Sequence, residues 1–148
     1  MRRNLILAAL LLGCSGRTPA VRPVEQARGL QGGIGSGVVV IRDAESWQAF
    51  VARQATESAL RLRELSIDFE RESFVLACHT ATSGSTKVRF SEPTFEDGVL
   101  VIEARTSTPS GPVRADVVRH CYAAIVEQPA LRAALVVDGR AVGSADPH

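Results

Sequence analysis

The chain has 148 residues, and its 17 lysines and arginines nearly balance its 16 aspartates and glutamates, which gives a formal net charge of +1 at pH 7. The basic residues are scattered singly, so the basic stripe typical of nucleic-acid-binding proteins is missing. The length suits one domain with a core of its own. We therefore expect a single domain and no nucleic-acid partner.

The first thirteen residues have the pattern of a bacterial lipoprotein signal peptide. Arg2 and Arg3 precede the apolar run Leu5–Leu12, which is far shorter than the ~20 residues that a membrane-spanning helix needs. Leu11-Leu12-Gly13-Cys14 then resembles a lipobox, with Cys14 as the lipid-bearing first residue of the mature chain. An ordinary signal peptide followed by a chance cysteine is the alternative. Because Ser15 follows the cysteine, as in lipoproteins sorted to the outer membrane, we expect a lipid-anchored protein there.

Residues 14–36 are rich in glycine, proline, arginine and glutamine, which predicts a flexible tether between the lipid and a domain at 37–148. A phosphate-binding loop would need a helix directly after the glycines at positions 32–37. The β-branched run Val38–Ile41 follows instead, so we expect a strand there and no cofactor.

A single clear helix follows the first strand. Asp43 is a suitable N-cap, and Trp47, Phe50 and Val51 recur at the spacing of one helical face. The segment from Glu57 to Ser66 fits neither the helical nor the strand period.

The rest of the chain predicts strands joined by turns. Asp-Gly pairs at 97–98 and 138–139 are typical of tight hairpin turns. The expected strands are Ser73–His79, which is apolar on both faces, and Lys87–Phe90, Val99–Ala104, Ala115–Val126 and the hairpin Leu135–Val142. The fold class is therefore mainly β: a small antiparallel sandwich or barrel-like sheet with one helix inserted after the first strand.

Cys78 and Cys121 form an even pair in an exported chain, which favours a disulfide over two buried thiols. Zinc bound by these cysteines with His79 and His120 is the alternative. If Cys78 lies opposite Cys121 in an antiparallel pair, His79 lies opposite His120. Successive side chains point to opposite faces, so one metal ion would not reach all four residues. We expect the disulfide and no bound metal.

No residue pattern identifies an enzyme. The sequence has no Gly-x-Ser-x-Gly nucleophile turn, and its paired carboxylates lie in predicted turns. The alternative to a non-catalytic domain is an envelope hydrolase or metal-binding protein that uses His79 or His120 with a neighbouring acid.

Several short segments together carry a resemblance to a known family. They are Val38–Ile41, Glu45-Ser46-Trp47, Ile67-Asp68-Phe69, Phe74–Ala77, Ser83–Val88 and Cys121-Tyr122. Through these segments, residues from Ser36 to about Val137 resemble the PrcB C-terminal domain family, small lipoprotein domains named for an accessory subunit of a bacterial surface protease complex. Ser85 and Thr86 replace a glycine and a tyrosine of the family's loop pattern, and Cys121 replaces a proline.

The resemblance implies a non-catalytic accessory domain that holds or modulates another envelope protein, such as a protease. Its recognition surface is expected on two loops, because loops on a rigid scaffold commonly carry binding. The structural alternative for the first loop is a tight connection that needs Gly84 at a positive φ. The loops are Pro109–Pro112 and the candidate binding loop Thr82, Ser83, Gly84, Ser85 and Thr86.

The lipobox generates a direct prediction. Replacing Cys14→Ser removes the acceptor thiol, so the protein should leave the membrane fraction and appear in the soluble envelope fraction. Fractionation followed by immunoblotting measures this, with Ser15→Ala as the matched control. Unchanged membrane recovery of the Cys14→Ser protein would contradict lipidation at this residue.

Overall fold

The computed structural model describes residues 16–25, 30, 35–112 and 115–146. The expected signal peptide at 1–13 and the lipidated Cys14 lie outside the described residues. None of the described helices is long and apolar enough to cross a membrane.

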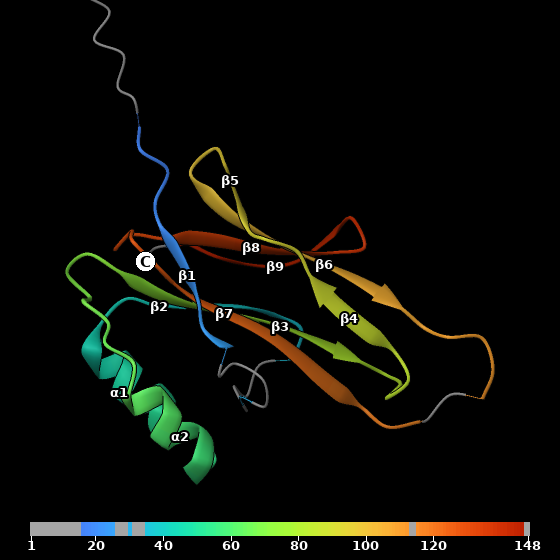
Figure 1. Ribbon diagram of the computed structural model, residues 1–148. Coiled ribbons are helices and arrows are strands. Elements are labelled where there is room, and N and C mark those ends of the chain that lie inside the picture. The colour runs from blue at the N-terminus through green and yellow to red at the C-terminus, as the bar shows by residue number, and fades with distance from the viewer. Residues whose placement is uncertain (1–15, 26–29, 31–34, 113–114, 147–148) are drawn as a thin grey trace, which may run out of the picture.

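Two stacked β-sheets form the body of the protein (Figure 1). The first has the order β1-β7-β3-β2 and is antiparallel throughout. Its strands are β1 (Val21–Pro23), β2 (Gly37–Ile41), β3 (Ser73–Ala81) and β7 (Val118–Val126).

The second sheet has the order β4-β6-β8-β9, with β5 also paired to β6. All of its pairs are antiparallel except β6 with β8, which run parallel. Its strands are β4 (Lys87–Phe90), β5 (Thr94–Glu96), β6 (Val99–Ser107), β8 (Arg132–Val137) and β9 (Arg140–Ala145). The predicted mainly-β sandwich is confirmed.

Both expected Asp-Gly turns are present. Asp97 and Gly98 have φ values of 49° and 78°, and Asp138 and Gly139 have 50° and 78°. Two consecutive residues with positive φ are the feature of the turn that matches the twist of a hairpin.

Two helices, α1 (Ala44–Ala52) and α2 (Thr56–Arg63), cover the outer face of the first sheet (Figure 1). Asp43 caps α1 by accepting the N–H of Ser46 at 2.7 Å, as predicted. The Trp47 ring lies 4.8 Å from that of Phe74 on β3, so the aromatic face of α1 packs on the sheet.

The prediction of a single helix was wrong, because α2 follows α1 directly. Leu60 is exposed and Leu62 is fully buried, so the leucines of this segment do not share one helical face. For this reason their spacing in the sequence does not match the period of a helix. Ala59 and Leu62, three residues apart, form the buried face, and Glu57 pairs with Arg61 on the exposed side.

The prediction of a tether over all of residues 14–36 was also wrong. Val21–Pro23 form β1, which pairs with β7, and Val24 and Leu30 are buried under the helices. The physical reason is that the C-terminal half of β7 is buried and needs a backbone partner on its outer edge. The ordered domain therefore begins before Gly37.

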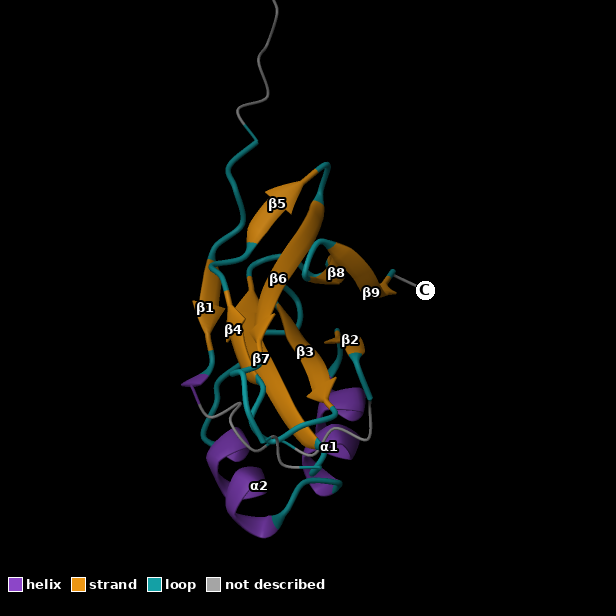
Figure 2. Cartoon of the chain, turned by 90° about the vertical axis from the view of Figure 1, so that its right-hand side faces the viewer, coloured by secondary structure: helices purple, strands orange, loops and turns teal. Residues whose placement is uncertain are grey.

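Two cores lie on opposite faces of the first sheet. One fills the space between the helices and the sheet and includes Leu62, Phe74 and Leu76. The other lies between the sheets and includes Leu100 and Leu135. The molecule thus has three layers: helices, first sheet and second sheet (Figure 2).

The two sides of the sandwich differ. On one side, β2 and β9 lie next to each other (Figure 2), and a Cβ built on Gly143 would lie 3.0 Å from the Cα of Gly37. On the other side, a pocket separates β4 from β7. The sandwich is closed backbone to backbone along one side and open along the other.

The close approach at Gly143 generates a stability prediction. A methyl group in Gly143→Ala would press on the backbone of β2, which cannot move aside cheaply, so the free energy of unfolding should fall by about 1–3 kcal/mol. Gly37→Ala is the matched control, because a Cβ there meets nothing within 4 Å. Urea denaturation measures both, and equal stabilities for the two variants would contradict the tight closure.

Candidate functional site

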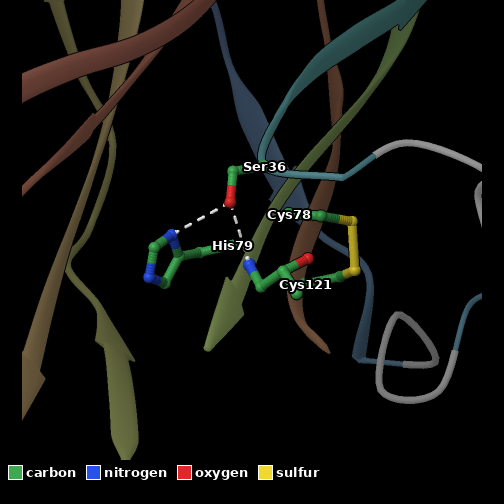
Figure 3. The surroundings of a disulfide bond; sticks show 5 residues. Ser36, Cys78, His79 and Cys121 are labelled. Carbon is green, nitrogen blue, oxygen red and sulfur yellow. Dashed lines mark hydrogen bonds between the residues drawn. A yellow bond between two sulfur atoms is a disulfide. The ribbon is translucent and has the colours of Figure 1, made fainter. Parts of the chain in front are cut away.

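Cys78 and Cys121 lie directly opposite each other on β3 and β7 and form a disulfide, which confirms the prediction (Figure 3). Their Cα atoms are 4.1 Å apart. Such a short separation is typical of the non-hydrogen-bonded pairs of an antiparallel ladder. The covalent bond therefore links β3 and β7 near the end of the sheet at which β3 ends and β7 begins.

The two histidines lie on the other face of the same strands. His79 pairs with His120 in the register, and the cysteines pack in the core under the helices. The expected separation of cysteines and histidines onto opposite faces is confirmed, and Figure 3 shows the His79 ring directed away from the disulfide. Among the described residues, no group of three or more His, Cys, Asp or Glu side chains is placed to hold a metal ion.

His79 contacts a hydroxyl group. Its Nδ1 lies 3.3 Å from Oγ of Ser36, and the same Oγ accepts the N–H of Thr80 at 3.0 Å (Figure 3). The side chain of Ser36 therefore connects the start of β2 to β3 next to their last paired residues.

The acid on which the charge of His79 acts, Asp138, is engaged elsewhere. Asp138 accepts the hydroxyl of Thr106 at 2.6 Å and its N–H at 2.9 Å. The hydroxyl bond and the N–H bond lower the pKa of Asp138 most, and the charge of His79 lowers it further. The hydroxyl and imidazole are thus in contact, but the carboxylate is held by Thr106 rather than bonded to the imidazole.

The two candidate loops lie together at one end of the sandwich (Figure 1). The loop 82–86 leads from β3 in the first sheet to β4 in the second, and the segment after β6 returns to β7 in the first sheet. Oγ1 of Thr86 and Oγ1 of Thr108 lie 2.9 Å apart. Thr108 directly precedes Pro109, so the fold brings the loop 82–86 next to the start of the second loop, which is distant in the sequence.

Gly84 lies close to the side chain of Asp116 and does not have the expected conformation. Its φ is not among the positive values of the described residues, so the expectation of a left-handed conformation was wrong. A Cβ on Gly84 would instead lie 2.6 Å from a carboxylate oxygen of Asp116. The glycine lets the loop 82–86 approach the segment that precedes β7.

A groove on the open side, which the sequence analysis missed, adjoins these loops. It has a volume of about 590 Å³ and is lined by Val88–Phe90 of β4 and by Arg119–Tyr122 of β7. Successive side chains of a strand point to opposite faces, so a lining of consecutive residues means that the groove opens onto strand edges. The groove could not be predicted because it forms between strands that are distant in the sequence. In the sequence, each of these strands shows only an arginine, Arg89 or Arg119.

Tyr122 lies in this groove and packs its ring 5.9 Å from that of Phe90. Its hydroxyl oxygen and Nε2 of His120 are both buried without a hydrogen-bond partner among the described residues. Burial raises the pKa of Tyr122, and the charge of Glu92 raises it further.

Comparison of the chain with protein-family models, with curated proteins and with solved structures finds no match.

The disulfide should contribute strongly to stability. Its partners are 43 residues apart, and closing a loop of that length lowers the entropy of the unfolded chain enough to stabilise the fold by about 4 kcal/mol. The double replacement Cys78→Ala/Cys121→Ala should lose this amount in urea denaturation. Reduction of the wild-type chain is the control that leaves both side chains in place, and unchanged stability on reduction would contradict this role.

Tyr122→Phe should leave the free energy of unfolding at pH 7 unchanged or raise it by up to about 1 kcal/mol, because it removes a buried hydroxyl that has no partner. Wild-type stability should also fall, relative to the variant, as the pH rises above the ordinary tyrosine value of 10.0, since the unfolded chain then loses this proton and the folded chain keeps it.

Denaturation of both proteins across this pH range measures the difference. Tyr122 is the only tyrosine, so the absorbance of tyrosinate reports its ionisation directly. A loss of more than about 1 kcal/mol in Tyr122→Phe at neutral pH would show that the hydroxyl has a partner.

Proposed function

We propose that this chain is a non-catalytic, lipid-anchored domain of the cell envelope that holds or modulates a partner protein. The observation that carries the proposal is the meeting of the loop 82–86 with the segment 108–112 at one end of the sandwich. This end combines exposed polar residues with a rigid base, the combination in which loops commonly carry binding.

The base of this end is fixed by three contacts. The disulfide joins β3 and β7 three residues before β3 ends, the hydroxyls of Thr86 and Thr108 meet at 2.9 Å, and Gly84 lies against Asp116. Thr82 and the residues from Pro109 to Pro112 are exposed above this base. A partner that contacts them would meet a surface that loses little conformational entropy on binding.

An exported location is consistent with the chemistry of the described residues. A disulfide between two core strands is typical of proteins from oxidising compartments. Together with the lipobox at Cys14, this supports anchoring at the outer membrane by the N-terminal lipid, with the domain outside the cytoplasm.

The resemblance of Ser36–Val137 to PrcB C-terminal domains makes an envelope protease our first choice of partner. An accessory domain of this kind needs no catalytic residues of its own. In this proposal His79 serves as part of the β2–β3 connection through Ser36 rather than as a catalytic base.

The binding end can be tested by changing its surface without touching its base. In Thr82→Glu/Ser110→Glu, two exposed hydroxyl side chains become charged, and recovery of the partner by crosslinking from native membranes should fall by at least about tenfold. Ser144→Glu is the matched control, because Ser144 is an exposed serine on β9, away from the two loops.

Equal recovery by all three proteins would contradict a role for this end in binding. Hydrolysis by the purified chain that is lost in His79→Ala or His120→Ala would replace the proposal with an enzymatic one.

A further inference from the structure

We infer that the groove between β4 and β7 binds an extended, acidic segment of the partner, which adds to the edge of β7 as an extra strand. This inference rests on the proposed function and names the chemistry of the partner. It is carried by the backbone groups of two strand edges and by the charges beside them.

Hydrogen bonds with the N-terminal segment fix which backbone groups of β7 face outward. The N–H of Val24 donates to the oxygen of Ala123 at 2.8 Å, and the N–H of Glu127 donates to that of Ala20 at 2.9 Å. Outward-facing residues alternate along a strand, so Cys121 and Arg119 also direct their N–H and C=O groups to this edge.

The separation of 4.1 Å between the Cα atoms of Cys78 and Cys121 supports the same assignment, because it marks a pair that is not hydrogen-bonded across β3 and β7. β1 ends at Pro23, opposite Ala124. Beyond Val24, no described strand pairs with this edge of β7.

The opposite wall of the groove is also an edge with which no described strand pairs. β4 is the end strand of the second sheet, and the N–H of Ser91 donates to the oxygen of Glu103 at 2.9 Å. By the same alternation, Val88 and Phe90 turn their N–H and C=O groups away from β6 and toward the groove. Unpaired strand edges are templates for the addition of another strand.

The fold itself uses this edge of β7 for strand addition. β1 is a short extended segment that pairs antiparallel with the C-terminal half of β7, beside the open half. A partner segment would occupy the remaining residues, Arg119 to Cys121, in the way that β1 occupies Ala124 to Val126.

The charges of the groove select an acidic segment. Arg89 and Arg119 are exposed, line the groove from its two sides, and form no ion pair with any carboxylate of the described residues. The lining also includes His120 and contains no acid, and Glu92, outside the lining, is the acid whose charge acts on Tyr122.

The test uses the full-length lipoprotein in detergent micelles and a labelled, end-blocked peptide in which glutamate and valine alternate. Fluorescence anisotropy should show saturable binding that weakens as salt is added. The same peptide with alternate backbone amides methylated keeps its charges but cannot donate those N–H groups to the backbone of β7. It should therefore bind at least about tenfold more weakly. A lysine–valine peptide should bind as weakly as the methylated one.

Protein variants locate the site. Arg89→Glu/Arg119→Glu should weaken binding of the glutamate peptide by about tenfold or more and should improve binding of the lysine peptide. Arg140→Glu is the matched control, because it changes an exposed arginine on β9 outside the groove and should leave both affinities unchanged.

Equal binding of the methylated peptide would overturn strand addition, and self-association of the chain that protects this edge would assign it to a second copy instead. Suppose that Thr82→Glu/Ser110→Glu loses capture of the envelope partner while Arg89→Glu/Arg119→Glu keeps it. That result would overturn the inference and leave the proposed function standing. Loss of capture in both variants would support the inference and the proposed function.

Discussion

The pairing of β3 with β7 is the constraint on which the rest of the structure depends. The two strands pair over nine residues from Ser73↔Val126 to Ala81↔Val118, and β3 is buried on both faces along its first six residues. A shift by one residue would move the apolar side chains of one core into the other and separate Cys78 from Cys121. The register therefore fixes the two cores, the disulfide and the placement of the histidines together.

The same pairing creates the difference between the two sides of the sandwich. β2 continues the first sheet beyond β3 and meets β9 at Gly37 and Gly143, where the absence of a side chain on Gly143 lets the two backbones touch. Among the described residues, the sheet continues beyond β7 only with the three residues of β1. An open strand edge thus remains beside the connected loops, which places backbone donors and acceptors, arginine side chains and exposed loops on one continuous part of the surface.

Much of this arrangement could be predicted from the sequence where the signal is local. The Asp-Gly pairs determine two hairpins, and Asp43 and the Trp47 face determine α1. Once Cys78 is assumed to lie opposite Cys121, the placement of His79 opposite His120 follows. β1 could not be predicted, because Pro23 has low strand propensity and the segment pairs with the edge of β7, which is distant in the sequence. The parallel pairing of β6 with β8 and the groove arise from contacts between distant segments, which no local pattern encodes.

Residue-resolved amide hydrogen exchange of the free chain tests most directly whether the side between β4 and β7 is open. If it is, the amides of Arg119 and Cys121 should exchange at least about tenfold faster than those of His120 and Tyr122, which face β3 in the same strand. Val88 and Phe90 should likewise exchange faster than Arg89. Equal protection of all residues along β7 would contradict the open edge, because a backbone partner would then already occupy it.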